Sequence, residues 1–220
     1  MSELTAHYPT PGAMRADLIV HAVGLTFALV GGGVLLGLIL GLGSLSLIAP
    51  VTVYLTGFVG MLALSAAYNF ARARWRPLLR RFDHAGIFIM IAGSYTPFTT
   101  LRLHGAWAIG MTTAVWALAA LGVAGKLFLP GLGRRFWVGL YLGLGWLALV
   151  AIKPMIHGLS WPALALLAIG GLVYSTGAAF YVVKTLKFRR AIWHGHVVGG
   201  SIFHYMAVLV GVVLAQGGLT

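Results

Sequence analysis

The sequence predicts an all-α protein, a bundle of seven transmembrane helices with the N-terminus in the cytoplasm and the C-terminus outside. Composition is the first reason, because 60% of the 220 residues are hydrophobic and only 8% are charged. A soluble domain of this composition would have too little polar surface to cover itself. The second and third reasons are the long runs without charge and the uneven placement of the charges between them. The solvent of this chain is therefore the lipid bilayer.

The first uncharged run extends from Leu18 to Ala71 and is too long for one crossing. A hydrocarbon core of ~30 Å needs about 20 helical residues at ~1.5 Å each. We therefore expect two spans here, joined by a turn at 41–44 with Pro50 marking the same place. Five later runs, each about one helix long, complete the count of seven. They are 84–101, 103–125, 136–152, 154–183 and 191–220.

The basic residues set the orientation, because Lys and Arg accumulate on the cytoplasmic side of membrane proteins. With the N-terminus inside, only Arg102 and Lys153 of the fifteen basic residues fall outside. The net charge of +12 then faces the anionic lipid of the inner leaflet. We expect membrane lipids as partners and no nucleic acid. The basic residues on the inner segments are Arg15, Arg72, Arg74, Arg76, Arg80, Arg81, Lys126, Arg134, Arg135, Lys184, Lys187, Arg189 and Arg190.

The chain is expected to form one domain, residues 17–220, after a flexible cytoplasmic arm at 1–16. Cysteine is absent, which excludes disulfides and thiolate metal sites. Glycines at four-residue spacing predict close packing of helices within the bundle, with a dimer interface as the alternative. These glycines are Gly33, Gly37 and Gly41 in the first span and Gly139 and Gly143 in the fifth.

Carboxylates limit the possible chemistry, because the chain has only three: Glu3, Asp17 and Asp83. Glu3 lies in the arm. Asp83 opens the third span, where an ionised group needs a partner or a water-filled cavity. Two interpretations are open at this position. Asp83 either caps the N-terminus of its helix or acts as a functional carboxylate.

Four histidines are expected at the same depth as Asp83, near the cytoplasmic ends of their helices: His21, His84, His194 and His196. They could share one vestibule that opens toward the cytoplasm. For each histidine taken alone, the alternative is a hydrogen-bonded packing residue.

Four segments resemble the hemolysin III family, the bacterial branch of the progestin and adipoQ receptors. The first is Ser65-Ala-Ala-Tyr-Asn69 followed by a basic loop, Asp83-His-Ala and Ile91-Ala-Gly-Ser-Tyr-Thr-Pro-Phe98. An earlier match is Val20-His-Ala-Val-Gly24, and later ones are Gly177-Ala-Ala-Phe-Tyr181 and Ala191-Ile-Trp-His194. The resemblance implies a seven-helix bundle with an inward N-terminus, located in the bacterial plasma (inner) membrane.

The resemblance also implies a zinc ion near the cytoplasmic side, held by three histidines with an aspartate nearby. The matching positions here are Asn69, Arg190 and His194, with Asp83 as the acid and Ser65 one turn before Asn69. An amide oxygen is a poor zinc ligand, and a guanidinium has no lone pair to offer. A metal would therefore depend on His194 and Asp83, with His21, His84, His196 and Ser65 as nearby polar candidates.

Arg190 suggests a replacement for the metal. A buried Asp83 needs a positive partner, and Arg pairs with carboxylates in a planar, bidentate manner. We therefore expect Arg190 to pair with Asp83, while Asn69 and His194 complete the hydrogen bonds. The alternative is an Arg190 side chain that extends to the inner interface.

Two functions are left open by the sequence. Missing ligands favour a non-catalytic protein of lipid sensing or membrane homeostasis with a degenerate metal site. The alternative is a metal-dependent membrane hydrolase that acts on a lipid amide or ester, with Asp83 as the catalytic general base.

Overall fold

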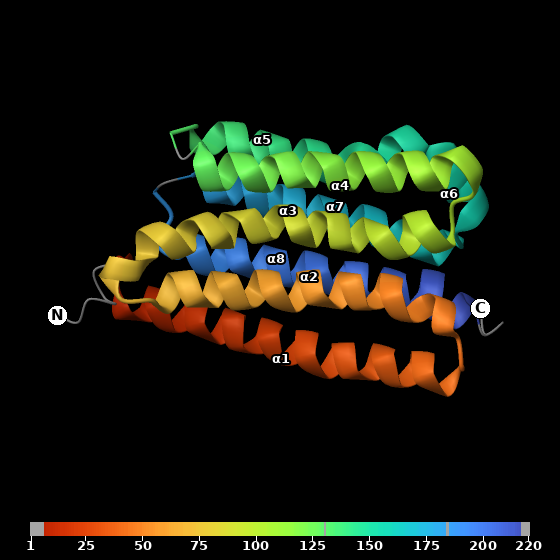
Figure 1. Cartoon of the computed structure of the whole chain (residues 1–220). Helices are drawn as coiled ribbons and strands as arrows, with labels where there is room; N and C mark the ends of the chain where they lie inside the picture. The colour runs from red at the N-terminus through yellow and green to blue at the C-terminus, as the bar shows by residue number, and fades with distance from the viewer. Residues whose placement is uncertain (1–6, 130, 184, 217–220) are drawn as a thin grey trace.

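The computed structural model describes residues 7–129, 131–183 and 185–216, and every regular element within them is helical (Figure 1). The elements are α1 (Pro11–Gly41), α2 (Leu45–Phe70), η2 (Ala73–Trp75), α3 (Arg76–Leu101), α4 (Gly105–Phe128), α5 (Arg134–Gly145), η3 (Trp146–Ala151), α6 (Ile152–Gly158), α7 (Trp161–Val182), α8 (Arg189–Val208) and η4 (Leu209–Leu214). Of the short ones, η2 and η3 are 3₁₀-helices and η4 is a turn of π-helix. The prediction of an all-α fold is confirmed.

Within the described residues, six helical segments are long and apolar enough to cross a membrane. They are α1, α2, α4, the continuous stretch Arg134–Gly158, α7 and the stretch Arg189–Leu214. Helix α3 is as long as α2 but begins with the basic loop and carries Asp83 and His84. It packs between α2 and α4 and contacts α8, and Asp83 is buried inside the bundle.

The first turn forms where the uncharged run predicts it, because α1 ends at Gly41 and α2 begins at Leu45. Gly43 has a φ of 62°, a left-handed conformation that glycine adopts without steric cost. Pro50 differs from the expectation. It lies inside α2, in the first turns of the helix, so it does not form part of the turn.

The fifth and sixth spans divide later than the charges suggest. We expected a boundary near Lys153, but the helical path continues to Gly158 and breaks before Trp161. Pro154 explains the change of helix type, because proline has no N–H and its ring crowds the carbonyl of Val150. The chain narrows to 3₁₀ geometry over Trp146–Ala151 and then resumes an α-helix.

The glycines that approach other helices are different from the expected ones. A Cβ added at Gly33, Gly37, Gly41, Gly139 or Gly143 would meet nothing within 4 Å. Two glycines with close interhelical contacts lie instead between α2 and α3. A Cβ at Gly57 would lie 3.3 Å from the carbonyl oxygen of Ile89, and one at Gly93 would lie 3.2 Å from that of Val53. Because these two glycines lack a side chain, the backbones of α2 and α3 can approach each other closely.

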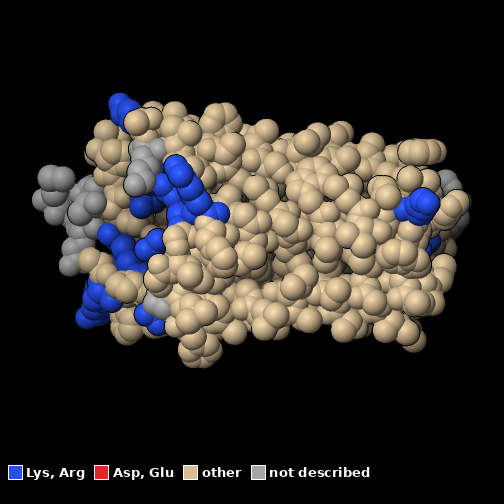
Figure 2. Space-filling view, turned by 90° about the horizontal axis from the view of Figure 1, so that it is seen from above, with Lys and Arg blue, Asp and Glu red and all other residues tan. Residues whose placement is uncertain are grey.

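The two ends of the described chain lie at opposite ends of the bundle (Figure 1). Figure 2 shows that most of the visible Lys and Arg side chains gather at the end where α1 begins. Helix α1 begins at Pro11, within the range expected for the arm, and the Thr10 hydroxyl accepts a hydrogen bond from the Ala13 N–H. Residues 1–6 of the expected arm lie outside the described residues.

Candidate metal centre

The polar centre is built around Asp17, on the second turn of α1, whose side chain is fully buried. The Nδ1–H of His194 in α8 donates to Asp17 Oδ1 across 2.6 Å. The Tyr8 hydroxyl donates to the other oxygen, Oδ2, across 2.6 Å. Both carboxylate oxygens therefore have a donor, which offsets the cost of burying the charge.

His21 follows one helical turn after Asp17 and is oriented by the same residue. Its Nδ1 lies 2.8 Å from the Asp17 main-chain carbonyl oxygen, which can only accept. Nδ1 therefore carries the hydrogen, and Nε2 carries a free lone pair. That lone pair lies 3.1 Å from Ser65 Oγ in α2.

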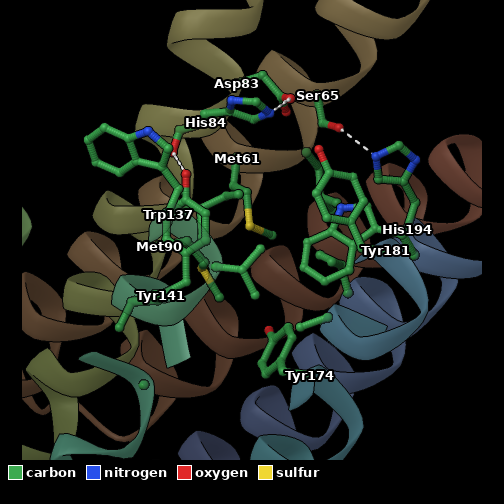
Figure 3. A pocket seen from close by; sticks show the side chains of 18 of the residues that line it. Met61, Ser65, Asp83, His84, Met90, Trp137, Tyr141, Tyr174, Tyr181 and His194 are labelled. Atoms are coloured by element: carbon green, nitrogen blue, oxygen red, sulfur yellow. Dashed lines mark hydrogen bonds and ion pairs between the residues drawn. The ribbon is translucent and has the colours of Figure 1, made fainter. Parts of the chain in front are cut away.

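His194 faces the same hydroxyl. Its Nδ1–H is used by Asp17, which leaves Nε2 as an acceptor 3.4 Å from Ser65 Oγ (Figure 3). The two imidazole rings are in edge contact, with centroids 4.4 Å apart. Asp17 thus orients both histidines through their Nδ1 atoms and directs both Nε2 lone pairs to one point beside Ser65.

This donor set fits a metal ion. Ser65 has one hydroxyl hydrogen and can satisfy only one of the two lone pairs, whereas a zinc ion accepts both. Metal-bound histidines commonly donate their other ring N–H to a carboxylate or main-chain carbonyl, and here Asp17 supplies both. Asp17, His21 and His194 each place one potential ligand atom within 4.8 Å of the others. Because Asp17 Oδ1 already accepts from His194 Nδ1–H, we assign Asp17 the orienting role and the histidine Nε2 atoms the ligand role.

Asp83 lies across from this pair, inside α3 and not at its start, so it is not a helix cap. It is about two turns past Arg76 and buried. Its Oδ2 is 3.9 Å from His84 Nε2, and it lies near Ser65 on the wall of the central cavity (Figure 3). A carboxylate at this point can accept a proton from a group held next to Ser65.

Asn69 and Arg190, the positions that resemble metal ligands, take other roles. Asn69 is buried and its Nδ2 donates to the main-chain oxygen of Ser65 at 3.0 Å and to Ser65 Oγ at 3.4 Å. Arg190 donates to the main-chain oxygen of His7, and its guanidinium lies 5.0 Å from the centroid of the Tyr8 ring. Among the ion pairs of the described residues none joins Arg190 to Asp83. The expected pair is therefore not present.

The segment before α1 closes the centre from the end of the bundle where α1 begins. Tyr8 is 5% exposed, and burial together with its hydrogen bond to Asp17 raises its pKa. Burial and the charge of Arg190 lower the pKa of His7 to about 4, so His7 is neutral at pH 7. A neutral His7 can lie beside the Arg190 guanidinium without repulsion.

The remaining histidines are divided. His84 lines the same cavity on the far wall, where its Nδ1 is 3.3 Å from Lys126 Nζ. His196 lies apart from it, because its Nδ1 donates to the Ile192 carbonyl and its ring packs against Phe180 of α7. The expected vestibule therefore gathers three of the four histidines.

The cavity between the helices has a volume of about 780 Å³. Polar groups occupy the end where α1 begins, and Met61, Met90, Tyr141 and Tyr174 surround the space beyond them (Figure 3). A second cavity of about 450 Å³ adjoins it toward the other end of the bundle. Together the two cavities form a space that is polar at one end and apolar at the other, which suits an amphipathic ligand.

Comparison with known proteins gives the family. The model of the family described as "Haemolysin-III related" matches residues 15–211. The chain belongs to the haemolysin III family. This haemolysin III chain is 32% identical over 196 residues to the "Hemolysin-3 homolog" of Bacillus subtilis, covering 88% of this chain and 92% of the relative. It is 33% identical over 198 residues to "Hemolysin-3" of Bacillus cereus, covering 88% and 89%. The human "Monocyte to macrophage differentiation factor" matches at 30% over 127 residues, 57% of this chain and 52% of the human protein.

Sequence reasoning gave Asp17 no role in the site of this haemolysin III protein. A signal was available, because Asp17 and His21 are four residues apart and so lie on one face of a helix. Their partner His194 is 177 residues away from Asp17. The pairing across the bundle depends on α1 lying against α8, and no local pattern expresses that contact.

Proposed function

We propose that this haemolysin III protein is a metal-dependent hydrolase that cleaves an ester or amide bond of a membrane lipid. One observation carries the proposal: the Nε2 atoms of His21 and His194 converge beside Ser65 on the wall of a cavity of about 780 Å³. Catalytic zinc sites combine three protein ligands with an open position, and here two histidine nitrogens converge on the cavity beside the Ser65 hydroxyl.

The residues have separable tasks in this mechanism. A zinc ion, when bound, would supply a water molecule of lowered pKa and a Lewis acid for a carbonyl oxygen. His21 and His194 would hold the ion, and Asp17 keeps both rings in the required tautomer. Asp83, on the cavity wall near Ser65, would hold the proton taken from the water and give it to the leaving oxygen or nitrogen. Asn69 holds the Ser65 main chain and hydroxyl in place beside them.

The membrane arrangement is also a proposal. We infer seven crossings, with α3 added to the six apolar segments, an inward N-terminus, and a location in the inner membrane of the cell. The start of α1 and the end of η4 at opposite ends of the bundle support an odd number of crossings (Figure 1). The basic end supports the orientation (Figure 2).

Metal content and lipid hydrolysis test the function together. Detergent-purified protein should contain near-stoichiometric zinc by elemental mass spectrometry, and His21→Ala should lose both the metal and the cleavage of a lipid ester or amide. His157→Ala is the matched control, because that exposed histidine lies in α6 at the far end of the bundle. A folded protein with no bound metal at saturating zinc would contradict the proposal.

A second candidate function is a non-catalytic lipid sensor or membrane-homeostasis protein with the same cavity. The contact between Arg190 and the segment before α1 favours it, because a guanidinium occupies one position that resembles a metal ligand. This function predicts that lipids bind and change the protein's thermal stability, while no product forms with any added divalent metal.

A further inference from the structure

Lys126, near the C-terminal end of α4, is a buried cation whose direct contacts are an imidazole and two aromatic rings. It is 9% exposed, and its Nζ lies 3.3 Å from His84 Nδ1, 4.2 Å from the Trp137 ring centroid and 6.0 Å from that of Tyr141. Among the ion pairs of the described residues none includes Lys126. Aromatic faces and an imidazole lone pair hold the ammonium in place, and the charge of Asp83 acts on it without forming an ion pair.

The cavity wall as a whole carries excess positive charge. Lys126 shares the wall with Arg80, Arg134 and Arg190, and Asp83 is the only carboxylate among the described residues that line it. A buried charge without a counter-ion is costly, and a bound anion removes that cost. The electrostatics of this end therefore suit a ligand with more than one negative charge, such as a phosphate monoester.

The apolar half suits a hydrocarbon chain. Six residues, Ser94, Tyr95, Gly145, Trp146, Gly171 and His204, line both the large cavity and the second cavity of about 450 Å³. The two spaces therefore meet, and beyond this boundary the second cavity is walled mainly by apolar side chains such as Phe98, Met111 and Met155. Gly171 is needed at the boundary, because a Cβ there would lie 3.2 Å from the Trp146 ring.

We propose that the cavity selects a single-chain lipid with a phosphate monoester headgroup, the phosphate at Lys126 and the chain passing Trp146 into the second cavity. The inference rests on the proposed function only for the bond that is cleaved. With the headgroup at Lys126, the bonds next to the phosphate would lie in the polar part of the cavity. Asp83 and His84 are on one side of that space, and the histidine pair is on the other. The phosphate itself could come from a lipid or from free phosphate, and the probes below separate the two.

Binding is measured with the full chain in nanodiscs of uncharged phosphatidylcholine. The probes are tritiated oleoyl lysophosphatidic acid, the uncharged oleoyl monoacylglycerol, and inorganic phosphate as competitor. We expect the lysophosphatidic acid to bind about tenfold tighter than the monoacylglycerol, which is the usual gain from one charge-assisted contact. Lys126→Gln should abolish this preference and Lys126→Arg should retain it. Lys153→Gln, at an exposed lysine of α6, should leave it unchanged.

Equal affinity of the two lipids in the wild type, or an unchanged preference in Lys126→Gln, would overturn the inference. Displacement of the lipid by millimolar inorganic phosphate as effectively as by the lipid itself would show an anion site without a chain site and would also overturn it. The test is independent of the proposed hydrolysis, because binding is scored in His194→Ala as well. A retained phosphate preference without any cleavage would support this inference and contradict the proposed function.

Discussion

The two walls of the cavity treat their charges in opposite ways. On the wall formed by α1, α2 and α8, Asp17 has a donor on each oxygen and the neighbouring histidines are oriented by it. On the wall formed by α3, α4 and α5, Lys126 contacts an imidazole and aromatic rings, and Asp83 lies 3.9 Å from His84 and within reach of the Ser65 hydroxyl, with no ion pair to Lys126. The first wall is organised before any ligand arrives. The second has charges that a ligand can still satisfy.

This difference suggests that the first wall holds a metal ion and that the second wall takes part in the reaction and in ligand binding. Groups that must keep a fixed geometry gain from complete hydrogen bonding, because each partner removes a rotational freedom. Groups that must bind a ligand or move a proton need hydrogen-bonding or charge-pairing capacity that the protein itself does not use. Variants on the first wall should therefore affect metal content, and variants on the second should affect chemistry and ligand choice.

The largest expected effect is at His194. His194→Ala removes one of two converging nitrogen atoms, so we expect complete loss of bound zinc and of lipid hydrolysis. Elemental mass spectrometry and product formation measure the two. His196→Ala is the control, since that residue is two positions along the same helix and outside the cavity. Undiminished zinc in His194→Ala would remove this residue from the metal centre.

Asp83→Asn is expected to distinguish the roles of the two walls. The amide has a similar shape and cannot accept the proton, so hydrolysis should fall about a hundredfold to ten-thousandfold. Zinc content should stay at the wild-type level, because the orienting carboxylate is Asp17. If zinc is lost together with activity, Asp83 is a ligand and the division between the walls is wrong.

Asp17→Asn should weaken the metal site without removing it. The variant keeps the side-chain shape but loses the charged hydrogen bond to His194, and such orienting partners are worth about 10-fold to 100-fold in metal affinity. Competition with a chromogenic chelator measures the affinity. Tyr8→Phe, which removes only a neutral hydroxyl from the same carboxylate, should have a smaller effect. An unchanged affinity in Asp17→Asn would contradict the orienting role.

Arg190→Gln is expected to have the smallest effect. Its contacts are to the segment before α1, so the free energy of unfolding should change by about 1 kcal/mol or less. Breaking a buried Arg190–Asp83 pair would instead cost about 3–5 kcal/mol. Thermal and denaturant unfolding in detergent distinguish these values, with Arg135→Gln at an exposed position as the control. A loss in the upper range would restore the pairing that the sequence suggested.

Much of the architecture could be predicted from local properties. Uncharged runs identified the helices because a bilayer admits few charges, and the turn at 41–44 followed from the length of one run and the glycines within it. The boundary near Lys153 was wrong because Lys and proline near a membrane surface are compatible with a continuing helix. The glycine spacing was also misleading, because it does not say which face of a helix meets a neighbour.

The candidate site was predicted in part. His194, Ser65, Asn69 and His21 do come together, as their depth and the resemblance suggested. Asp17 was assigned no role, and Arg190 was paired with the wrong group. Both errors have one origin: depth in the membrane can be read from the chain, whereas the direction a side chain takes around the helix axis depends on the neighbouring helices.

The sequence by itself determined that this chain is a helical membrane protein of the haemolysin III family with its basic residues concentrated between alternate runs, because charge and hydropathy are properties of single segments. Only the tertiary structure decided which carboxylate orients the histidines, where Arg190 binds, and that Lys126 is buried against an imidazole and aromatic rings. Those choices depend on contacts between α1 and α8 and between α3, α4 and α5. Such contacts join residues that are far apart in the chain. Hydrogen bonds and charge interactions depend on interatomic distances to within a few ångströms, and the sequence of a single segment does not determine those distances.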